Sequence, residues 1–474
     1  MKLKGVVRMK STSISLEQAN FKASRLELLS KADCNQCAAI MYDYSQENHR
    51  IIFMIDSKSF YASVESVMRG LHPLKSILVV MSTAENTGSG LVLAASPMAK
   101  KRLGISNVTR ARDVPRQDAR LIIAPPRMNL YIKENARIQH IFRQFTAEED
   151  IQPYSIDESL LDMTDSWSLF GVSPVEVARK IQLAVKAATG IYLTVGIGDN
   201  PLLAKLALDL EAKQSRSLIA QWHYEDVPNK LWPITQLTRV WSIGQRTAEQ
   251  LNRYQIYSLA DLAHTNPYLI KQKFGVLGSQ LFALSWGIDR ALMRQPYRPQ
   301  VQSYSNSQVL PRDYQQQAVI EIVIREITEQ VAARLRAHHQ AATVITLGIG
   351  YAFAEKKQQA HSGFGHSAKV TATNSNRLLT KVALQLFRER WHGEILRHIS
   401  ITCGGIVTDK LEQLDLFTPA WQQAKQRQLD HTIDSIRQRY GFAALVKLSS
   451  KAPGATAISR TGLVGGHAGG NVYE

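Results

Sequence analysis

Three carboxylates have the residue types and the spacing expected of a metal-assisted reaction. Asp56 ends an apolar run, residues 51–55, that is typical of a buried strand, and Asp157 and Glu158 are adjacent. Carboxylate oxygens are the ligands that Mg²⁺ prefers, and two such ions about 3.5–4 Å apart can activate an attacking hydroxyl and stabilise a leaving phosphate oxygen. Successive strand side chains point to opposite faces, so Asp157 and Glu158 can serve one site only at a turn or a distortion. The alternative is an exposed acidic turn without chemistry.

Strand and helix patterns surround these carboxylates. The strand that ends at Asp56 is followed by a predicted helix over 57–68 and a buried strand over 76–81, which is β-α-β order. A second α/β stretch is predicted to contain a strand over 155–163, a helix over 174–188 capped by Ser173, a strand over 192–197 and a helix over 201–210.

The rest of the chain divides into a helical region and a mixed region. Residues 222–287 have apolar residues at helical spacing with glycine punctuation, and residues 296–308 have the Pro, Gln and Ser content of a linker. Beyond it, an α+β domain is predicted with helices over 318–338 and 378–391 and strands over 343–351 and 395–407. A polar helix is expected to end near residue 440, and the glycine pairs after residue 453 predict a flexible tail up to residue 474.

The composition favours a globular protein that binds a polyanion. The 474 residues carry a formal net charge of +17, so nucleic acid is the first partner to expect. The sequence has no run of 18 apolar residues and no secretory signal, which favours a cytoplasmic protein without a membrane partner. Three cysteines do not make a disulfide framework, and the CxxC pair Cys34 and Cys37 lacks the further ligands of a zinc site.

The first 49 residues are polar and precede the first strong strand signal. We expect these 49 residues to form an N-terminal extension. If Met41 is the true start, residues 1–40 lie upstream of the protein; otherwise they form a loose basic arm.

Three blocks of sequence, in this order and at suitable spacing, carry a resemblance to a known family. They are Asp56-Ser-Lys-Ser-Phe-Tyr-Ala-Ser-Val-Glu65, Ser155-Ile-Asp-Glu-Ser-Leu-Leu-Asp162 and Val195-Gly-Ile-Gly-Asp-Asn-Pro-Leu-Leu-Ala-Lys205. Together they resemble the Y-family translesion DNA polymerases, closest to the UmuC-like (ImpB/MucB/SamB) branch of bacterial SOS polymerases, over roughly residues 50–420. The glycine pair in the third block lacks the third spaced glycine of a dinucleotide-binding fold.

The resemblance implies a multidomain α/β fold with the right-hand arrangement of a polymerase. It places a palm at 50–220 with inserted fingers at about 72–140, a helical thumb at 221–295 and an α+β little finger at 296–410. Residues 411–474 would hold a clamp-binding motif, the polar helix and the tail.

The resemblance also assigns site residues. Asp56, Asp157 and Glu158 match the metal-binding carboxylates, and the backbone carbonyl of Ser57 would complete one coordination shell around the two Mg²⁺ ions. Tyr61 matches the aromatic gate that excludes a 2′-hydroxyl. The alternative for Tyr61 is an aromatic of the core, a role that suits Phe60 better. Phe60 is nevertheless also assigned to nucleotide binding. Lys205 matches a lysine that meets the triphosphate.

The fingers depart from the pattern of the family. The family commonly has Tyr-Glu-Ala-Arg, whereas this chain has Pro97-Met-Ala-Lys-Lys101. Either Lys100 or Lys101 could supply the phosphate contact, and Lys58 stands where many members have Asp or Asn, which puts nucleotide selectivity in doubt.

Two further motifs point to DNA and to a partner protein. The segment Val240–Ala248 looks like a helix-hairpin-helix, in which a glycine turn exposes backbone N–H groups to a phosphate; its candidate DNA contacts are Ser242, Ile243, Gly244 and Arg246. The segment Gln413-Leu414-Asp415-Leu416-Phe417 is similar to the bacterial motif that binds the sliding clamp, where leucine and phenylalanine fill an apolar groove.

These features predict an error-prone DNA-directed DNA polymerase for translesion synthesis, acting on primer-template DNA and dNTPs without proofreading. A sliding clamp, RecA-type activators and SOS accessory proteins are the expected partners. One alternative is a noncatalytic DNA-binding or clamp-associated scaffold that kept the fold. A narrower alternative is an enzyme like DNA polymerase IV that is active alone, as against a subunit that needs an SOS partner.

Overall fold

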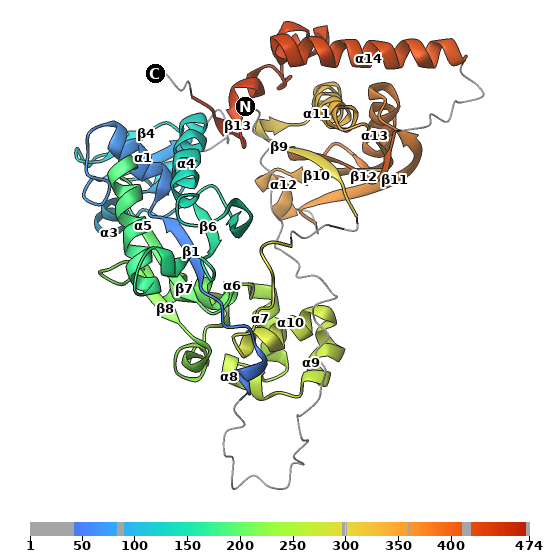
Figure 1. Ribbon diagram of the computed structural model, residues 1–474. Helices are drawn as coiled ribbons and strands as arrows, with labels where there is room; N and C mark the ends of the chain where they lie inside the picture. The colour runs from blue at the N-terminus through green and yellow to red at the C-terminus, as the bar shows by residue number, and fades with distance from the viewer. Residues whose placement is uncertain are drawn as a thin grey trace. The chain divides into compact units, whose positions relative to one another are not determined.

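The computed structural model describes residues 42–82, 90–295, 299, 301–358, 361–409 and 419–470, with side chains omitted at 357 and 358. The chain divides into two compact units. Figure 1 labels the helices and strands named below. The first comprises residues 1–76 and 131–297, and the second comprises residues 77–130 and 298–474. No helix among the described residues is long and apolar enough to cross a membrane.

A five-stranded sheet forms the core of the first unit. Its order is β5-β6-β1-β7-β8, with β7 and β8 parallel and the other neighbours antiparallel. The strands are β1 (Ile52–Ser57), β5 (Ile151–Pro153), β6 (Glu158–Asp162), β7 (Leu193–Gly198) and β8 (Ile219–Trp222). The associated helices are α1 (Phe60–Met68), α4 (Met128–Phe142), α5 (Pro174–Thr189) and α6 (Pro201–Leu206).

The helix α5 begins where the sequence predicts. The side chain of Ser173 accepts a hydrogen bond from the backbone N–H of Glu176, and Pro174 occupies the first turn, where its missing N–H costs nothing. The helix α4 contacts one face of the sheet, because Gln139 Nε2 donates to Ser159 Oγ at 2.7 Å.

The opposite face of the sheet receives α6. Ile52 and Met54 of β1 share a small core with Ala204 and Leu208. The predicted helix over 201–210 is shorter than expected, because α6 ends at Leu206 and continues as a π-helical turn, Ala207–Ala212. A π-helical turn inserts an extra residue and so changes which side chains face the sheet.

Two glycines let this helix approach the sheet closely. A Cβ added at Gly196 would lie 2.2 Å from the carbonyl oxygen of Ala204 and 2.3 Å from the N of Leu208, and one at Gly198 would lie 2.3 Å from the N of Ala204. Gly196 and Gly198 are two residues apart and therefore share the face that α6 covers. Helix–strand packing, not cofactor binding, is the structural role of this glycine pair.

A helical subdomain completes the first unit. It contains α7 (Gln245–Arg253), α8 (Leu259–His264), α9 (Pro267–Phe274) and α10 (Val276–Ser285), packed around a core that includes Leu251, Leu262 and Trp286. Residues 42–49 differ from the expected extension, because they pack on this subdomain. Tyr44 stacks on Tyr224 with ring centroids 4.7 Å apart, and its hydroxyl donates to the carbonyl of Trp286 at 2.9 Å.

The second unit begins with a three-stranded sheet of order β3-β2-β4. The strands are β2 (Leu78–Ser82), β3 (Leu91–Ala95) and β4 (Ile122–Ala124), and α3 (Pro97–Leu103) packs beside them. Ser96 caps α3 by accepting from the backbone N–H of Ala99.

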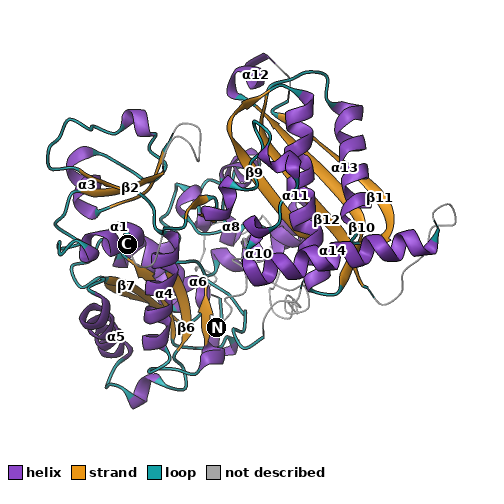
Figure 2. Ribbon diagram, turned by 90° about the horizontal axis from the view of Figure 1, so that it is seen from above, coloured by secondary structure: helices purple, strands orange, loops and turns teal. Residues whose placement is uncertain are grey.

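A four-stranded antiparallel sheet of order β11-β10-β12-β9 forms the larger part of this unit. Its strands are β9 (Tyr304–Tyr314), β10 (Gln340–Tyr351), β11 (Gly363–Thr373) and β12 (Leu396–Thr408). The helices α11 (Gln317–Ala337) and α13 (Asn376–Arg390) lie side by side on one face of the sheet, and α12 (Phe353–Gln358) follows β10 (Figure 2). Strand β9 starts inside the segment predicted as a linker, and β11 was not predicted.

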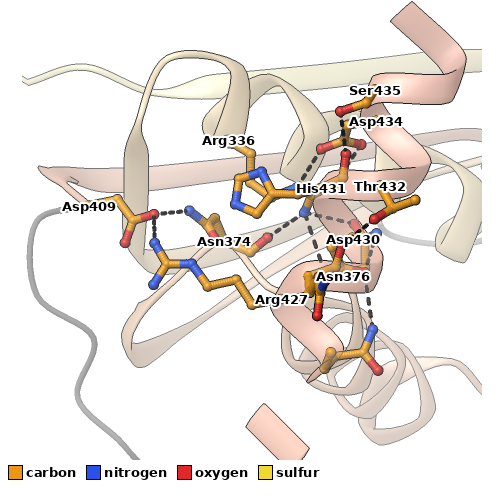
Figure 3. Close-up of polar contacts among 12 residues, drawn as sticks. Arg336, Asn374, Asn376, Asp409, Arg427, Asp430, His431, Thr432, Asp434 and Ser435 are labelled. Carbon is orange, nitrogen blue, oxygen red and sulfur yellow. Dashed lines mark hydrogen bonds and ion pairs between the residues drawn. The ribbon is translucent and has the colours of Figure 1, made fainter. Parts of the chain in front are cut away.

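Helix α14 (Ala420–Tyr440), the predicted polar helix, is fixed to this subdomain by buried charges (Figure 3). Arg336, 3% exposed, pairs with Asp434 at 2.6 Å and lies 3.8 Å from Asp430, which is 2% exposed. Asp430 also accepts from the backbone N–H of Asn376 at 3.1 Å. An isolated buried charge is costly, so the arginine and the aspartates must stay together.

Residues 453–470, which were predicted to be a flexible tail, are instead packed. A carboxylate oxygen of the buried Glu326 accepts hydrogen bonds from the backbone N–H groups of Thr456 and Ala457, each at 2.9 Å. The hairpin of β13 (Leu463–Val464) and β14 (His467–Ala468) follows. Sequence composition missed this docking because Glu326 lies far away in the sequence.

Candidate active site

The three predicted carboxylates lie together at one edge of the five-stranded sheet. Asp56 on β1 is directly opposite Glu158 on β6, so both side chains belong to the face that α6 covers. Asp157 precedes β6 in the turn after β5, and its carbonyl accepts from the backbone N–H of Ser57 at 2.8 Å. The turn required for adjacent carboxylates to serve one site is therefore present, and Ser57 lies beside it.

Two lysines, one on α6 and one directly after the π-helical turn, pair with two of these carboxylates. Lys205 Nζ is 2.6 Å from Glu158 Oε1, and Lys213 Nζ is 2.9 Å from Asp56 Oδ2. Asp209 lies between the two lysines, 3.3 Å from Lys205 Nζ and 2.8 Å from Lys213 Nζ. The arrangement holds two ammonium groups within reach of any phosphate that approaches the carboxylates.

Lys213 and Asp209 are site residues that the sequence analysis missed. Lys205, Asp209 and Lys213 follow each other at intervals of four residues, the spacing of neighbours on a helix surface, which is a signal that could have found them. Burial alone would lower the pKa of Lys213, but the charges of Asp56 and Asp209 raise it above its ordinary value, so the side chain stays protonated. Lys58 Nζ donates to the carbonyl of Lys213 at 3.2 Å and supports the end of this turn.

The electrostatics of Asp157 suit a cation. Burial, followed by the charges of Asp56 and Glu158, raises its pKa to about 6, although a hydrogen bond from Ser155 at 2.7 Å opposes the shift. Three carboxylates and the nearby Ser57 carbonyl supply the all-oxygen donor set of Mg²⁺. The oxygens of these three carboxylates are not all within 4.8 Å of one another. Among the described residues, the group that meets this distance consists of Asp199, His223 and Glu225.

The two aromatics at the start of α1 differ in exposure. Phe60 is 2% exposed and lies in the core, so its ring is not available to a nucleotide, and its predicted role in nucleotide binding is not supported by this position. The ring of Tyr61 is partly exposed and stacks on Tyr131, with centroids 4.4 Å apart and planes at 18°. Burial and the charge of Asp157 raise the pKa of Tyr61 to about 12, so the phenol is neutral and faces the field of the carboxylate cluster.

The predicted helix-hairpin-helix turn exposes its backbone. Gly244 caps the N-terminus of α7, and Ser242 before it has a left-handed φ of 75°. Ser242, Gly244 and Arg246 are exposed, whereas the side chain of Ile243 is 3% exposed and anchors the turn in the core. Trp241 Nε1 donates to Tyr154 Oη at 3.1 Å, and Tyr154 lies beside Lys205, which links the helical subdomain to the carboxylate site.

The remaining predicted residues lie elsewhere. Lys100 and Lys101 are exposed on α3 in the second unit. The clamp motif 413–417 and the pair Cys34 and Cys37 lie outside the described residues.

Comparisons with known proteins agree with this fold. Residues 55–209 match the impB/mucB/samB family, residues 224–256 match the IMS family HHH motif, and residues 301–416 match the impB/mucB/samB family C-terminal domain. A protein of Bacillus subtilis (strain 168) with the name "Putative UV-damage repair protein UvrX" is 40% identical over 90% of this chain and 100% of its own length. DNA polymerase IV 2 of the same organism is 31% identical over 88% of this chain and 98% of its own length.

A solved structure supports the architecture. A Y-family DNA polymerase chimera of Dbh and Dpo4 is 22% identical and has a TM-score of 0.61, covering 76% of this chain and 99% of the chimera. The five-stranded sheet with its helices corresponds to a palm, the three-stranded sheet to fingers, the helical subdomain to a thumb and the four-stranded sheet to a little finger. The chain therefore belongs to the impB/mucB/samB family and is a Y-family DNA polymerase.

Proposed function

We propose that this polymerase adds deoxynucleotides to a primer terminus opposite damaged template bases by two-metal nucleotidyl transfer. The observation that carries the proposal is the grouping of Asp56, Asp157 and Glu158 at one edge of the palm sheet, with the ammonium groups of Lys205 and Lys213 beside them. The carboxylates are the residues that would hold Mg²⁺. When bound, Mg²⁺ supplies charge that lowers the pKa of the primer 3′-hydroxyl and stabilises the leaving pyrophosphate.

The lysines exchange partners when metal ions and a nucleoside triphosphate bind at the site. In the free protein they neutralise Glu158 and Asp56, whose oxygens are also the proposed metal ligands. A triphosphate offers the lysines new anionic partners, and Asp209 keeps both ammonium groups near the site during the exchange. Nucleotide binding and metal binding therefore support each other in this proposal.

Tyr61 acts as the sugar gate. Its ring is held against Tyr131, which limits its rotation, and its position at the start of α1 is close enough for the charge of Asp157 to raise its pKa. A fixed ring under the incoming sugar would collide with a 2′-hydroxyl. Phe60 supports the same turn from inside the core.

The exposed thumb turn binds the DNA backbone. The N-terminus of α7 offers unpaired N–H groups beside Arg246, a combination that contacts phosphate regardless of base. We also propose that the 413–417 motif binds a sliding clamp, which would keep the enzyme near the primer terminus. The lysines Lys100 and Lys101 are proposed phosphate contacts from the fingers.

Primer extension with Mg²⁺ on undamaged and abasic templates tests the chemistry. The variant Asp157→Ala/Glu158→Ala should lose extension while retaining DNA binding, whereas the adjacent exposed pair on a turn, Glu148→Ala/Glu149→Ala, is the matched control. Equal extension by both variants would refute the assignment of the carboxylates. Absence of extension by the wild type, even with clamp and activator, would favour the noncatalytic scaffold.

The role in the SOS response is part of the proposal and has its own test. The relatives include a UV-damage repair protein and several proteins named DNA polymerase IV. Extension past an abasic site should be measured with and without a RecA-type activator and a sliding clamp. Strict dependence on the activator would indicate a UmuC-like subunit, and full activity without it would indicate an enzyme of the polymerase IV type.

A further inference from the structure

A second cluster of metal-ligating side chains lies at the end of the palm sheet opposite the carboxylate site. Asp199 directly follows β7, and His223 directly follows the parallel neighbour β8. Asp56 pairs with Thr194 near the other end of β7. Thr194 and Asp199 are five positions apart along the chain, which corresponds to about 16 Å at about 3.3 Å per residue.

The cluster brings together donors from separate segments of the chain. One ligand atom each from Asp199, His223 and Glu225 lies within 4.8 Å of the others. His49, on the segment before β1, adds a second imidazole, with Nδ1 3.8 Å from Asp199 Oδ2. Parallel strands end at the same edge of a sheet, which explains why Asp199 and His223 meet although 23 residues separate them in the sequence.

The charge of this cluster differs from that of the catalytic carboxylates. Asp56 and Glu158 each pair with a lysine, whereas the ion-pair partners of Asp199 among the described residues are the two histidines. The side chain of Asp199 is 4% exposed, and Oδ2 accepts from the backbone N–H of Tyr224 at 2.9 Å. With neutral imidazoles, Asp199 and Glu225 give the cluster two negative charges, which a divalent cation would neutralise.

Hydrogen bonds at both ring nitrogens fix the orientation of His223. Its Nδ1 lies 2.8 Å from Asp199 Oδ1, and its Nε2 lies 2.9 Å from the side-chain amide nitrogen of Gln221. A metal-bound imidazole normally donates its other N–H to a nearby acceptor. Rotation of the Gln221 side-chain amide by 180° exchanges its oxygen and nitrogen, and the oxygen then accepts the hydrogen bond from Nε2 of His223.

We propose that Asp199, His223 and Glu225, with His49 as a fourth donor, bind a transition-metal ion of the Zn²⁺ type. Two imidazoles and two carboxylates favour Zn²⁺ over Mg²⁺, which prefers oxygen ligands. The bound ion would join the segment before β1, the palm strands and the first turn of the thumb, Tyr224–Asp226. This role is independent of nucleotidyl transfer at Asp56, Asp157 and Glu158.

Zinc binding to purified protein tests the proposal. The background is the full chain carrying Asp157→Ala/Glu158→Ala, which removes most of the competing palm site. We expect this protein to bind one Zn²⁺ ion in equilibrium dialysis, to show Co²⁺ absorption bands of an imidazole-ligated site, and to retain Zn²⁺ in excess Mg²⁺. Adding His49→Ala/Glu225→Gln should weaken the Zn²⁺ affinity at least tenfold.

The control distinguishes this site from surface histidines. His140→Ala/Glu249→Gln changes an exposed histidine and an exposed glutamate and should leave the Zn²⁺ affinity unchanged. His49 has a half-exposed side chain and Glu225 is exposed, so their replacement should preserve folding, which far-UV circular dichroism would verify. The proposal fails if the two variants bind Zn²⁺ equally well, or if the background protein binds no Zn²⁺. Either result would leave a hydrogen-bonded His–Asp contact without a metal.

Discussion

Replacing Gly196 with alanine tests whether close packing of α6 on β7 positions Lys205 and Lys213 beside the carboxylates. The new Cβ would meet the Ala204 carbonyl at 2.2 Å and the Leu208 nitrogen at 2.3 Å, whereas ordinary contacts begin at 3.4 Å. The shortfall is about 1.2 Å, and both obstructing atoms belong to backbone that cannot rotate away. The helix and the π-helical turn after it must therefore move off the sheet by about 1 Å.

This displacement should affect both stability and catalysis. Overpacking of a well-packed core typically costs about 1–3 kcal/mol, and backbone obstruction places Gly196→Ala at the upper end. Lys205 and Lys213 lie on the moving segment, and a misplacement of about 1 Å in a catalytic group can lower the rate about 100-fold. We expect a lower midpoint in urea unfolding. We also expect a loss in single-nucleotide insertion rate that is larger than the loss of folded protein can account for.

A matched glycine separates the steric effect from the general effect of a methyl group. Gly404 lies in β12, and an added Cβ there meets nothing within 4 Å. Gly404→Ala should have wild-type stability and insertion rate. Wild-type behaviour of Gly196→Ala in both assays would show that α6 tolerates the displacement, and the argument that the glycines position the lysines would be wrong.

Three further predictions address the gate, the buried charges and the tail. Tyr61→Ala should admit ribonucleotides in single-nucleotide insertion, while the exposed thumb variant Tyr268→Ala should not; unchanged sugar discrimination would remove Tyr61 from the gate. Arg336→Ala should lower the free energy of unfolding of the little finger by about 3–5 kcal/mol, because Asp430 would stay buried without its partner, and an unchanged urea midpoint would contradict this. Burial lowers the pKa of His467, so the unfolded tail binds a proton first as the pH falls below 6.5 and the packed tail loses stability. Amide protection factors in the tail hairpin, which correct for the pH dependence of intrinsic exchange, should fall from pH 7.5 to 5.5, and His467→Gln should abolish that fall.

Features set by neighbours in the sequence were predictable, and those set by distant contacts were not. The cap of Ser173 on α5 and the paired carboxylates follow from local residue types. The start of β9 fell within the predicted linker, residues 296–308, because of the Pro, Gln and Ser content of that segment. Polar residues suit the place of β9 at the edge of the sheet, and Pro311 further along the strand costs no ladder hydrogen bond there. The docking of the tail depends on Glu326, about 130 residues earlier, and no local pattern reports it.

The candidate site shows the same division. The residue types predicted Asp56, Asp157 and Glu158, but the π-helical turn that directs Asp209 and Lys213 toward them could not be predicted from propensity. A regular helix advances by 3.6 residues per turn, so positions eight apart drift around its axis by about 80°. The wider turn of Ala207–Ala212 reduces that drift and allows Lys205 and Lys213 to face the same cluster, in which Lys205 pairs with Glu158 and Lys213 pairs with Asp56.

The balance of charge at this site gives a physical reason why the proposed reaction would need a divalent cation although the protein is strongly basic. The whole chain carries +17, which attracts DNA from a distance. At the site, however, the four carboxylates of Asp56, Asp157, Glu158 and Asp209 outnumber the two ammonium groups of Lys205 and Lys213, so the ionised cluster is net negative. When a triphosphate binds without a divalent cation, the lysines pair with the phosphates and leave the carboxylates without a positive partner. These carboxylates would then repel the triphosphate. Nucleotide affinity should therefore depend on divalent cations in the wild type, and that dependence should weaken when the carboxylates are replaced, a relation that nucleotide binding measured with non-catalytic Ca²⁺ can check.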